Sequence, residues 1–374
     1  MKNLKIGQTQ AMIRQMKIGQ TVVVISAEDI RRFCMKIMKC VLVLALVSCG
    51  NKSKSTTLPN VTSADLHAQI ERVTPLLNWC DGQAAGASPN NMDHRPNCDV
   101  GDAMAESGFL TLVGNFSNES TIFASMAASF GADGQPFRAP SYVGKDTQDE
   151  FSRDQLLGLV AGTVAGLPAG HLQTALDYYK RTHSLCPHPT DTRCLVTPSL
   201  MVRAKSVLGH EPTKLEATTD KAVMLAEAAS VPLTYQAGLL ANHIFVIARQ
   251  NKLTVSYAKA INILWKRAPQ NLWLSTVNAV CNRGTAADFD AIAQSLLTCL
   301  KSWTAPGTDW TFSHGNEVCR PNARGHELVA LAHFLMKVDV APKDPNDGAP
   351  VIVATPVPEE IPSPQPQGTP EFVP

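Results

Sequence analysis

Four charged residues in the first half of the chain could together form a site for acid–base chemistry. Asp102 stands at the start of one apolar segment, and Arg153 and Asp154 stand at the start of another. Arg138 lies between them in the sequence. Two carboxylates accompanied by arginines are the groups that acid and base catalysis at a glycosidic bond requires. Acids at helix starts also interact favourably with helix dipoles, so a structural role for each remains open.

These residues stand in three phrases. They are Gly101-Asp102-Ala103-Met104-Ala105-Glu106-Ser107-Gly108, Pro136-Phe137-Arg138-Ala139-Pro140 and Phe151-Ser152-Arg153-Asp154-Gln155-Leu156-Leu157-Gly158. Their order, GD…SG, RxP and FSRDQ, resembles that of a group of bacterial and phage-associated helical proteins with α/α-toroid-like chains, which are similar to polysaccharide-processing toroid enzymes. The resemblance covers residues 98–170, and Asp309-Trp310 and Arg324 form a looser later match.

The resemblance and the residue chemistry together give two hypotheses. In a toroid of helical hairpins the starts of the inner helices line one mouth, so the acids would converge there. The first hypothesis is a glycosidase- or lyase-like enzyme acting on a polysaccharide or peptidoglycan-type glycan. Its predicted catalytic residues are Asp102 and Asp154, and its predicted substrate-binding residues are Arg138, Arg153, Asp309, Trp310 and Arg324. The alternative is a non-catalytic helical envelope lipoprotein that binds a glycan or a partner protein, with each acid capping its own helix.

Residues 35–49 carry the parts of a secretory signal. Lys36 and Lys39 precede an apolar run that is too short to span a bilayer of roughly 30 Å. Leu46-Val47-Ser48-Cys49 then resembles a bacterial lipobox, in which the cysteine is acylated. We therefore expect a lipid anchor at Cys49, with the membrane as partner, and a location in the bacterial cell envelope, at the outer membrane or the periplasmic face.

Composition divides the rest of the chain. The last segment holds ten of the 25 prolines and cannot form a packed core, so we expect an extended, disordered tail. The predicted segments are an upstream mis-start or extension at 1–34, a signal peptide at 35–48, a tether at 49–61, a helical domain at 62–340 and the proline-rich tail at 341–374.

Ten cysteines are consistent with export to an oxidising compartment. Seven of them follow Cys49, which allows up to three disulfides and one free thiol. Two pairs flank short loops rich in helix breakers, so we expect Cys186 to bond with Cys194 and Cys80 with Cys98. A zinc site in the 186–194 loop is the alternative, although the loop lacks the CxxC spacing of structural zinc sites.

From residue 62 the apolar residues recur at helical spacing between prolines, which predicts an all-α fold of antiparallel helical hairpins. The expected helices are 64–79, 101–114, 119–129, 152–166, 169–183, 198–208, 218–229, 233–250, 254–267, 270–280, 286–303 and 323–338. Ser152 and Gln155 are expected to form a capping box. Gly158, Gly162 and Gly166 recur every fourth residue, which predicts a smooth stripe for close helix packing.

Charge and motifs exclude several classes of function. The formal net charge of +1 provides no concentrated basic surface, so we expect no nucleic-acid partner. The sequence has no phosphate-cradling glycine loop and no dinucleotide fingerprint, so we expect no cofactor. Ala330 occupies the place of the second histidine that an HExxH metalloprotease motif needs, and we expect no metal. His243, on an apolar segment, is expected to be a hydrogen-bonded core histidine.

Overall fold

A computed structural model describes residues 17–18, 21–22, 61–86, 100–114, 118–145, 151–186, 192–307, 315–319 and 323–338. The contacts divide the chain into two units, Met1–Pro59 and Asn60–Pro374. The described strands of the first unit, β1 (Lys17–Ile18) and β2 (Thr21–Val22), form an antiparallel pair. Every helix that the structure describes belongs to the second unit.

The second unit is mostly helical, which confirms the predicted all-α class. Its described helices are α2 (Ser63–Val73), α3 (Ala103–Val113), α4 (Glu119–Ala128), α5 (Arg153–Ala165), α6 (Ala169–Thr182), α7 (Pro198–Val207), α8 (Lys214–Ser230), α9 (Tyr235–Arg249), α10 (Val255–Arg267), α11 (Leu272–Cys281), α12 (Ala286–Ser302) and α13 (His326–Lys337). The finer expectation of an α/α-toroid stays a prediction.

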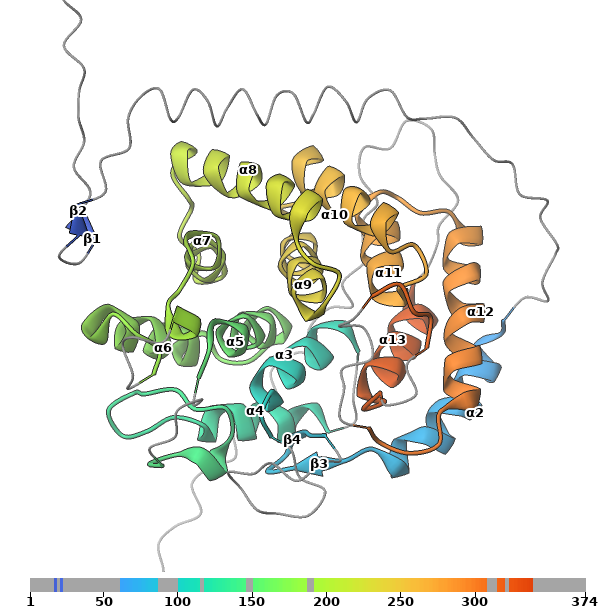
Figure 1. Ribbon diagram of the computed structural model, residues 1–374. Coiled ribbons are helices and arrows are strands. Elements are labelled where there is room, and N and C mark those ends of the chain that lie inside the picture. The colour runs from blue at the N-terminus through green and yellow to red at the C-terminus, as the bar shows by residue number, and fades with distance from the viewer. Residues whose placement is uncertain are drawn as a thin grey trace, which may run out of the picture. The chain divides into compact units, whose positions relative to one another are not determined.

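Contacts between these helices close into a circuit. In order, α3 contacts α5, α5 contacts α9, α9 contacts α11, α11 contacts α12, α12 contacts α13, and α13 contacts α3. Further helices flank this circuit: α2 packs on α12 and α13, α6 on α5, and α8 on α7 and α10 (Figure 1). The last helix thus packs against both the first and the second helix of the unit, which joins its two ends.

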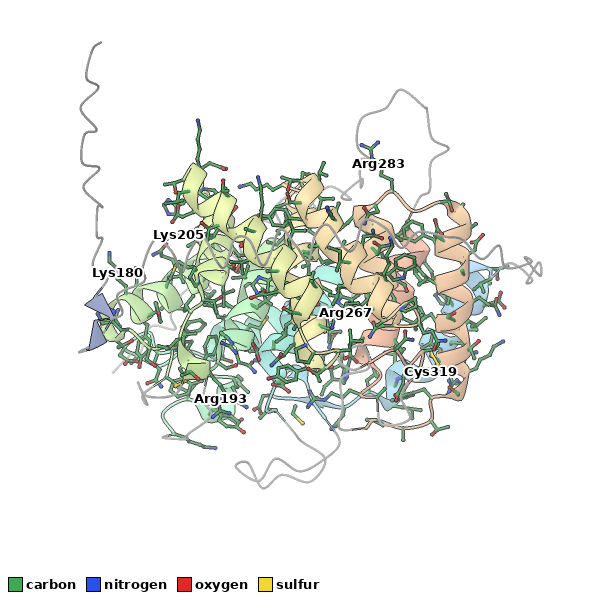
Figure 2. The ribbon with its side chains drawn as sticks, turned by 45° about the horizontal axis from the view of Figure 1, so that its top comes forward. Lys180, Arg193, Lys205, Arg267, Arg283 and Cys319 are labelled. Carbon is green, nitrogen blue, oxygen red and sulfur yellow. A yellow bond between two sulfur atoms is a disulfide. The ribbon has the colours of Figure 1, made fainter. Side chains whose placement is uncertain are left out.

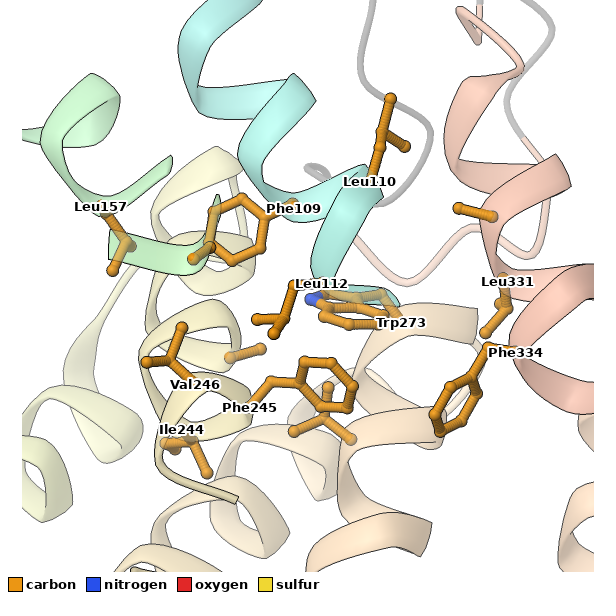
Figure 3. Close-up of a cluster of buried hydrophobic side chains, with 14 of the residues drawn as sticks. Phe109, Leu110, Leu112, Leu157, Ile244, Phe245, Val246, Trp273, Leu331 and Phe334 are labelled. Carbon is orange, nitrogen blue, oxygen red and sulfur yellow. The ribbon is translucent and has the colours of Figure 1, made fainter. Parts of the chain in front are cut away.

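Apolar side chains fill the space between these helices. Phe245 of α9 makes edge contacts with Trp273 of α11 and Phe334 of α13, at ring-centroid distances of 5.0 and 5.9 Å (Figure 3). The indole N–H of Trp273 donates to Asn242 Oδ1 at 2.7 Å, which satisfies the polar atom of this buried ring. Each such buried side chain stabilises the fold by about 1.5–3 kcal/mol.

The predicted helix at 64–79 is too long. The α-helix ends at Val73, and a 3₁₀ turn over Thr74–Leu76 follows, because Pro75 has no N–H to continue the helical bonds. The chain then forms a short antiparallel hairpin of β3 (Trp79–Cys80) and β4 (Gln83–Ala84). Asp81 and Gly82 turn it with φ angles of 54° and 78°, as an Asp-Gly hairpin turn requires.

The predicted start of the helix at 218 is also wrong. Helix α8 begins at Lys214, because Thr213 and Glu216 form a capping box at its N-terminus. The Thr213 hydroxyl accepts the Glu216 N–H at 3.2 Å, and the Glu216 carboxylate accepts the Thr213 N–H at 2.9 Å. The apolar spacing that guided the prediction begins only after this polar first turn.

Disulfides brace the second unit. Cys186 and Cys194 are bonded as predicted, so their sulfur atoms do not form the alternative zinc site. A second disulfide, which the sequence did not predict, joins Cys299 and Cys319 (Figure 2). Cys80 is also disulfide-bonded, and its expected partner, Cys98, lies outside the described residues.

Among the described helices, none combines the length and the apolar character that a membrane crossing demands.

Candidate functional site

Helices α3 and α5 approach each other at the level of their backbones. A Cβ atom on Gly108 would lie 1.8 Å from the Gly158 carbonyl oxygen, and one on Gly158 would lie 2.4 Å from Ala105 Cα. On Gly162, a Cβ would meet Met126 Cε at 2.8 Å. The predicted close packing of the small-residue stripe is therefore confirmed at Gly158 and Gly162.

Gly166 has a different role from the other two glycines of that stripe. It is the C-cap of α5, with φ of 132°, a backbone conformation that residues with a Cβ rarely adopt. It therefore ends the helix.

The two helices run in the same direction. Gln155, at the start of α5, bonds to Gly101 and Ala105 at the start of α3, whereas Gly162, one turn after Gly158, faces Gly108. The contacts advance along both helices together, so both N-termini lie at one end of the pair. The first N–H groups of both helices, which have no acceptor within the helix, and the positive dipole ends therefore lie at the same end of the pair.

The two predicted catalytic acids stand at these neighbouring N-termini. Asp102 is the N-cap residue of α3, but its side chain makes no capping hydrogen bond. Asp154 is the second residue of α5, and the cap there is Ser152, whose hydroxyl accepts the Asp154 N–H at 3.3 Å. Neither carboxylate therefore caps its own helix, although both lie at the positive end of a helix dipole.

The predicted capping box at the start of α5 is wrong. Its Gln155 side chain does not return to Ser152 but crosses to the neighbouring helix. Gln155 is fully buried, and its Oε1 accepts the backbone N–H of Ala105 at 3.0 Å. Its Nε2 donates to the Gly101 carbonyl at 3.1 Å and lies 3.4 Å from Asp102 Oδ1. The side chain therefore caps α3 instead of α5.

Both predicted arginines lie beside the helix starts that carry the two acids. Arg138 Nη1 donates to the Gly101 carbonyl at 2.6 Å, and its buried Nε has no hydrogen-bond partner among the described residues. Arg153 Nε lies 3.9 Å from Asp154 Oδ1, with both side chains partly exposed. The structure thus brings together four of the predicted residues, from α3, α5 and the segment between α4 and α5.

The charges at this site act on one another. Burial raises the pKa of Asp154, and the charge of Asp102 raises it further, whereas Arg153 and Arg138 oppose the rise. The net effect is a pKa of Asp154 above its usual value. Burial raises the pKa of Glu227 of α8, and the charge of Arg153 opposes this rise.

Arg324, the fifth predicted residue that the structure describes, lies in a buried ion pair instead. Its Nη1 is 2.6 Å from Oε2 of Glu106, and the two side chains are 3% and 0% exposed. His326 Nδ1 lies 3.7 Å from the other Glu106 oxygen, and its Nε2 is 2.9 Å from the Asn78 carbonyl oxygen. Burial and Arg324 lower the pKa of His326 to about 3, so the imidazole is neutral.

Asp309, Trp310 and the lipidation residue Cys49 lie outside the described residues.

A second buried polar cluster joins α7, α8 and α10. Arg203 Nη2 lies 2.8 Å from Asp220 Oδ2, and the Tyr257 hydroxyl donates to the same oxygen at 2.5 Å. His243 of α9 lies within reach of the Arg203 charge, and burial and this charge lower its pKa to about 3. Its Nδ1 has no hydrogen-bond partner among the described residues, so the expected hydrogen bond is not made at this nitrogen.

A groove of about 660 Å³ opens elsewhere on the second unit, between α6 and α7. Lys180 and Lys205 stand on its two helices (Figure 2), and Leu176, Tyr179 and Met201 contribute apolar surface. Neither Asp102 nor Asp154 lines it, so it does not contribute to the acid pair.

Sequence reasoning missed two buried polar residues on α3 and α5, the helices of the acid pair. Gln155 was interpreted as a local capping residue, and Glu106 stood inside an apolar segment without a visible partner. The signal for Glu106 was a lone acid in an apolar helix, which requires a buried cation, here Arg324, far along the chain.

Within the described part of the chain, no three His, Cys, Asp or Glu side chains gather closely enough to hold a metal ion. Comparison with known proteins adds no relative: no protein-family model matches the chain, and no curated protein or solved structure matches it.

Proposed function

We propose that this chain is a lipid-anchored enzyme of the bacterial envelope that hydrolyses a polysaccharide or peptidoglycan-type glycan. One observation carries the proposal. Asp102 and Asp154 stand at the adjacent N-termini of two parallel helices, neither caps its own helix, and the charge of one acts on the other. Glycosidases require a pair of carboxyl groups, one as the acid and the other as the base or nucleophile.

The environments of the two acids suggest different roles. Burial and the neighbouring carboxylate keep Asp154 protonated to higher pH, which suits a general acid that donates a proton to the leaving-group oxygen. Asp102 then serves as the carboxylate that activates water or attacks the sugar carbon. If activated water attacks the sugar carbon while Asp154 protonates the leaving oxygen, the glycosidic bond breaks and one water molecule is added in a single step. If Asp102 itself attacks, a glycosyl ester forms as the leaving group departs, and water then hydrolyses that ester and restores the carboxylate.

The two arginines are suited to bind the substrate. Arg153 is partly exposed, and its Nε lies at a long 3.9 Å from Asp154 Oδ1. Arg138 is anchored through Nη1 on the Gly101 carbonyl, which fixes its guanidinium beside the start of α3. Guanidinium groups in such positions donate to hydroxyl or carboxylate oxygens of a sugar.

The envelope location rests on the signal-like sequence and on the disulfides. Residues 35–49 have the order of a lipoprotein signal, with the acylated residue at Cys49. The disulfides Cys186–Cys194 and Cys299–Cys319 support folding in an oxidising compartment.

The test is product release from a panel of polysaccharides and purified peptidoglycan. The wild-type chain is compared with Asp102→Asn and Asp154→Asn, and the thermal melt of each variant is recorded as the control for folding. We expect new reducing ends with the wild-type chain and at least a ~100-fold loss in each variant without a lower melting temperature.

The same assay separates the competing functions. An unsaturated, ultraviolet-absorbing product would mean elimination by a lyase instead of hydrolysis. Binding of a glycan without any release of product would instead support the non-catalytic envelope lipoprotein, and would contradict the enzyme.

A further inference from the structure

Gln155 connects the two helix starts that carry the acids. Its amide is fully buried, and each end of it has a separate partner on α3. Oε1 accepts the Ala105 N–H at 3.0 Å, while Nε2 donates to the Gly101 carbonyl at 3.1 Å and lies 3.4 Å from Asp102 Oδ1. Because a backbone donor occupies the oxygen, the amide cannot turn over without losing that bond, so its NH₂ group faces Asp102.

We propose that Gln155 is the positioning residue of the acid pair: from α5 it holds the Asp102 carboxyl group at the start of α3, beside Asp154. This inference rests on the proposed function for its catalytic meaning. The arrangement is rigid, because Arg138 donates to the same Gly101 carbonyl at 2.6 Å. The glycine contact between Gly108 and Gly158 fixes the separation of the two helices.

A residue that only capped α3 would need fewer hydrogen bonds than Gln155 makes. Capping α3 requires only the acceptor Oε1 on the Ala105 N–H. The donor end of the amide reaches Gly101 and Asp102, and its contact with Asp102 gives a charge-sensitive link between the helices. That link is measurable separately from stability.

The first experiment uses the wild-type chain and follows side-chain amide resonances by NMR during a pH titration. We expect the Gln155 NH₂ signal to follow the titration of Asp102, to keep that response in Asp154→Asn, and to lose it in Asp102→Asn. Gln173 is the matched control, because its Nε2 donates to Asp177 Oδ1 at 3.0 Å on α6. Its signal should titrate identically in all three proteins.

The second experiment follows the carboxyl signal of Asp154 in Gln155→Met. We expect the titration midpoint of Asp154 to fall, because Asp102 is released from α5, and no further fall when Gln155→Met is added to Asp102→Asn. The groups that also act on Asp154, Arg153 and Arg138, are unchanged in both backgrounds.

The outcomes are separable from those of the cleavage assay. An equal fall of the midpoint in both backgrounds, or a Gln155 signal that ignores Asp102, would overturn the positioning role even if glycan is cleaved. A Gln155 signal that follows Asp102 supports the positioning role even if the chain cleaves no glycan, in which case only the proposed function fails. The NMR experiment on the wild-type chain also answers the question if Gln155→Met does not fold.

Discussion

Gly108 and Gly158 touch through their backbones, and this contact sets the distance between the two helices that carry Asp102 and Asp154. A Cβ atom on Gly108 would overlap the Gly158 carbonyl group. Parallel helices this close place their N-termini side by side, so two acids that are 52 positions apart in the sequence share one electrostatic environment. The small-residue interface is therefore part of the site.

Substitution of Gly158 by alanine should destabilise the fold and separate the acids. The added Cβ would lie 2.4 Å from Ala105 Cα, and backbone atoms cannot give way as a flexible side chain can. We expect a loss of about 1–3 kcal/mol in the free energy of unfolding, measured by urea denaturation. Gly170→Ala is the matched control, because nothing lies within 4 Å of that position, and it should be neutral or stabilising by up to about 1 kcal/mol. Equal effects of the two substitutions would contradict this packing.

The helices were predictable from sequence because each carries an apolar spacing and is bounded by breakers. The errors lie where a capping box or a proline, and not the apolar spacing, decides the boundary. Thr213 and Glu216 start α8 one turn before its apolar pattern begins, and Pro75 stops α2 inside a continuing apolar pattern. The hairpin after it depends on Asp81 and Gly82 in left-handed conformations, a turn signal that the helical pattern concealed.

Asp154→Asn should stabilise the chain at neutral pH. The pKa of Asp154 is raised from its usual value of 3.8, so the folded state binds this proton more tightly than the unfolded chain does. Stability is therefore lost as the pH rises from 3.8 through the folded-state pKa, and it stays lower above it. We expect Asp154→Asn to have a higher melting temperature than wild type at pH 7 and the same one near pH 3. A lower melting temperature at pH 7 would mean that the carboxylate has a structural role.

Arg324→Met should strongly lower the free energy of unfolding, because it leaves the Glu106 carboxylate buried without its cation. Breaking a buried pair in this way costs about 3–5 kcal/mol. Lys205→Met is the control, since Lys205 and Glu216 form an exposed pair at 3.9 Å, for which about 0–1 kcal/mol is expected. Urea denaturation of both variants distinguishes the buried pair from the exposed one, and equal losses would refute the distinction.

Reduction of the disulfides should lower the free energy of unfolding, while the free cysteine Cys281 stays unreactive in the folded chain. The Cys186–Cys194 and Cys299–Cys319 bonds close loops of 8 and 20 residues, each worth about 2–3 kcal/mol by loop entropy. We expect dithiothreitol to lower the melting temperature and Cys281, which is free and buried, to react with a thiol reagent only after unfolding. An unchanged melting temperature would weaken the case for an oxidising compartment.

The acids and arginines of the site were predictable because their residue types stand out at helix starts. Their spatial arrangement was not, because it depends on contacts between segments about 50 positions apart. Gln155 shows why. Its place three residues after Ser152 fits a local capping box, yet the nearby start of α3 offers the Ala105 N–H, for which helix α3 itself has no acceptor, and the Gly101 carbonyl. A neighbouring helix with unsatisfied ends can thus recruit a side chain from a local motif.

The most direct test of the central claim, that Asp154 donates the proton and Asp102 acts at the sugar carbon, compares two leaving groups on one sugar. The sugar is the one released from the glycan panel, carried either by its natural glycan partner or by nitrophenol, which needs no protonation to leave. We expect Asp154→Asn to lose about 100- to 10,000-fold in kcat/KM on the glycan but far less on the nitrophenyl glycoside, and Asp102→Asn to lose activity on both. If Asp154→Asn loses both activities equally, or neither variant loses any, the assigned roles are wrong.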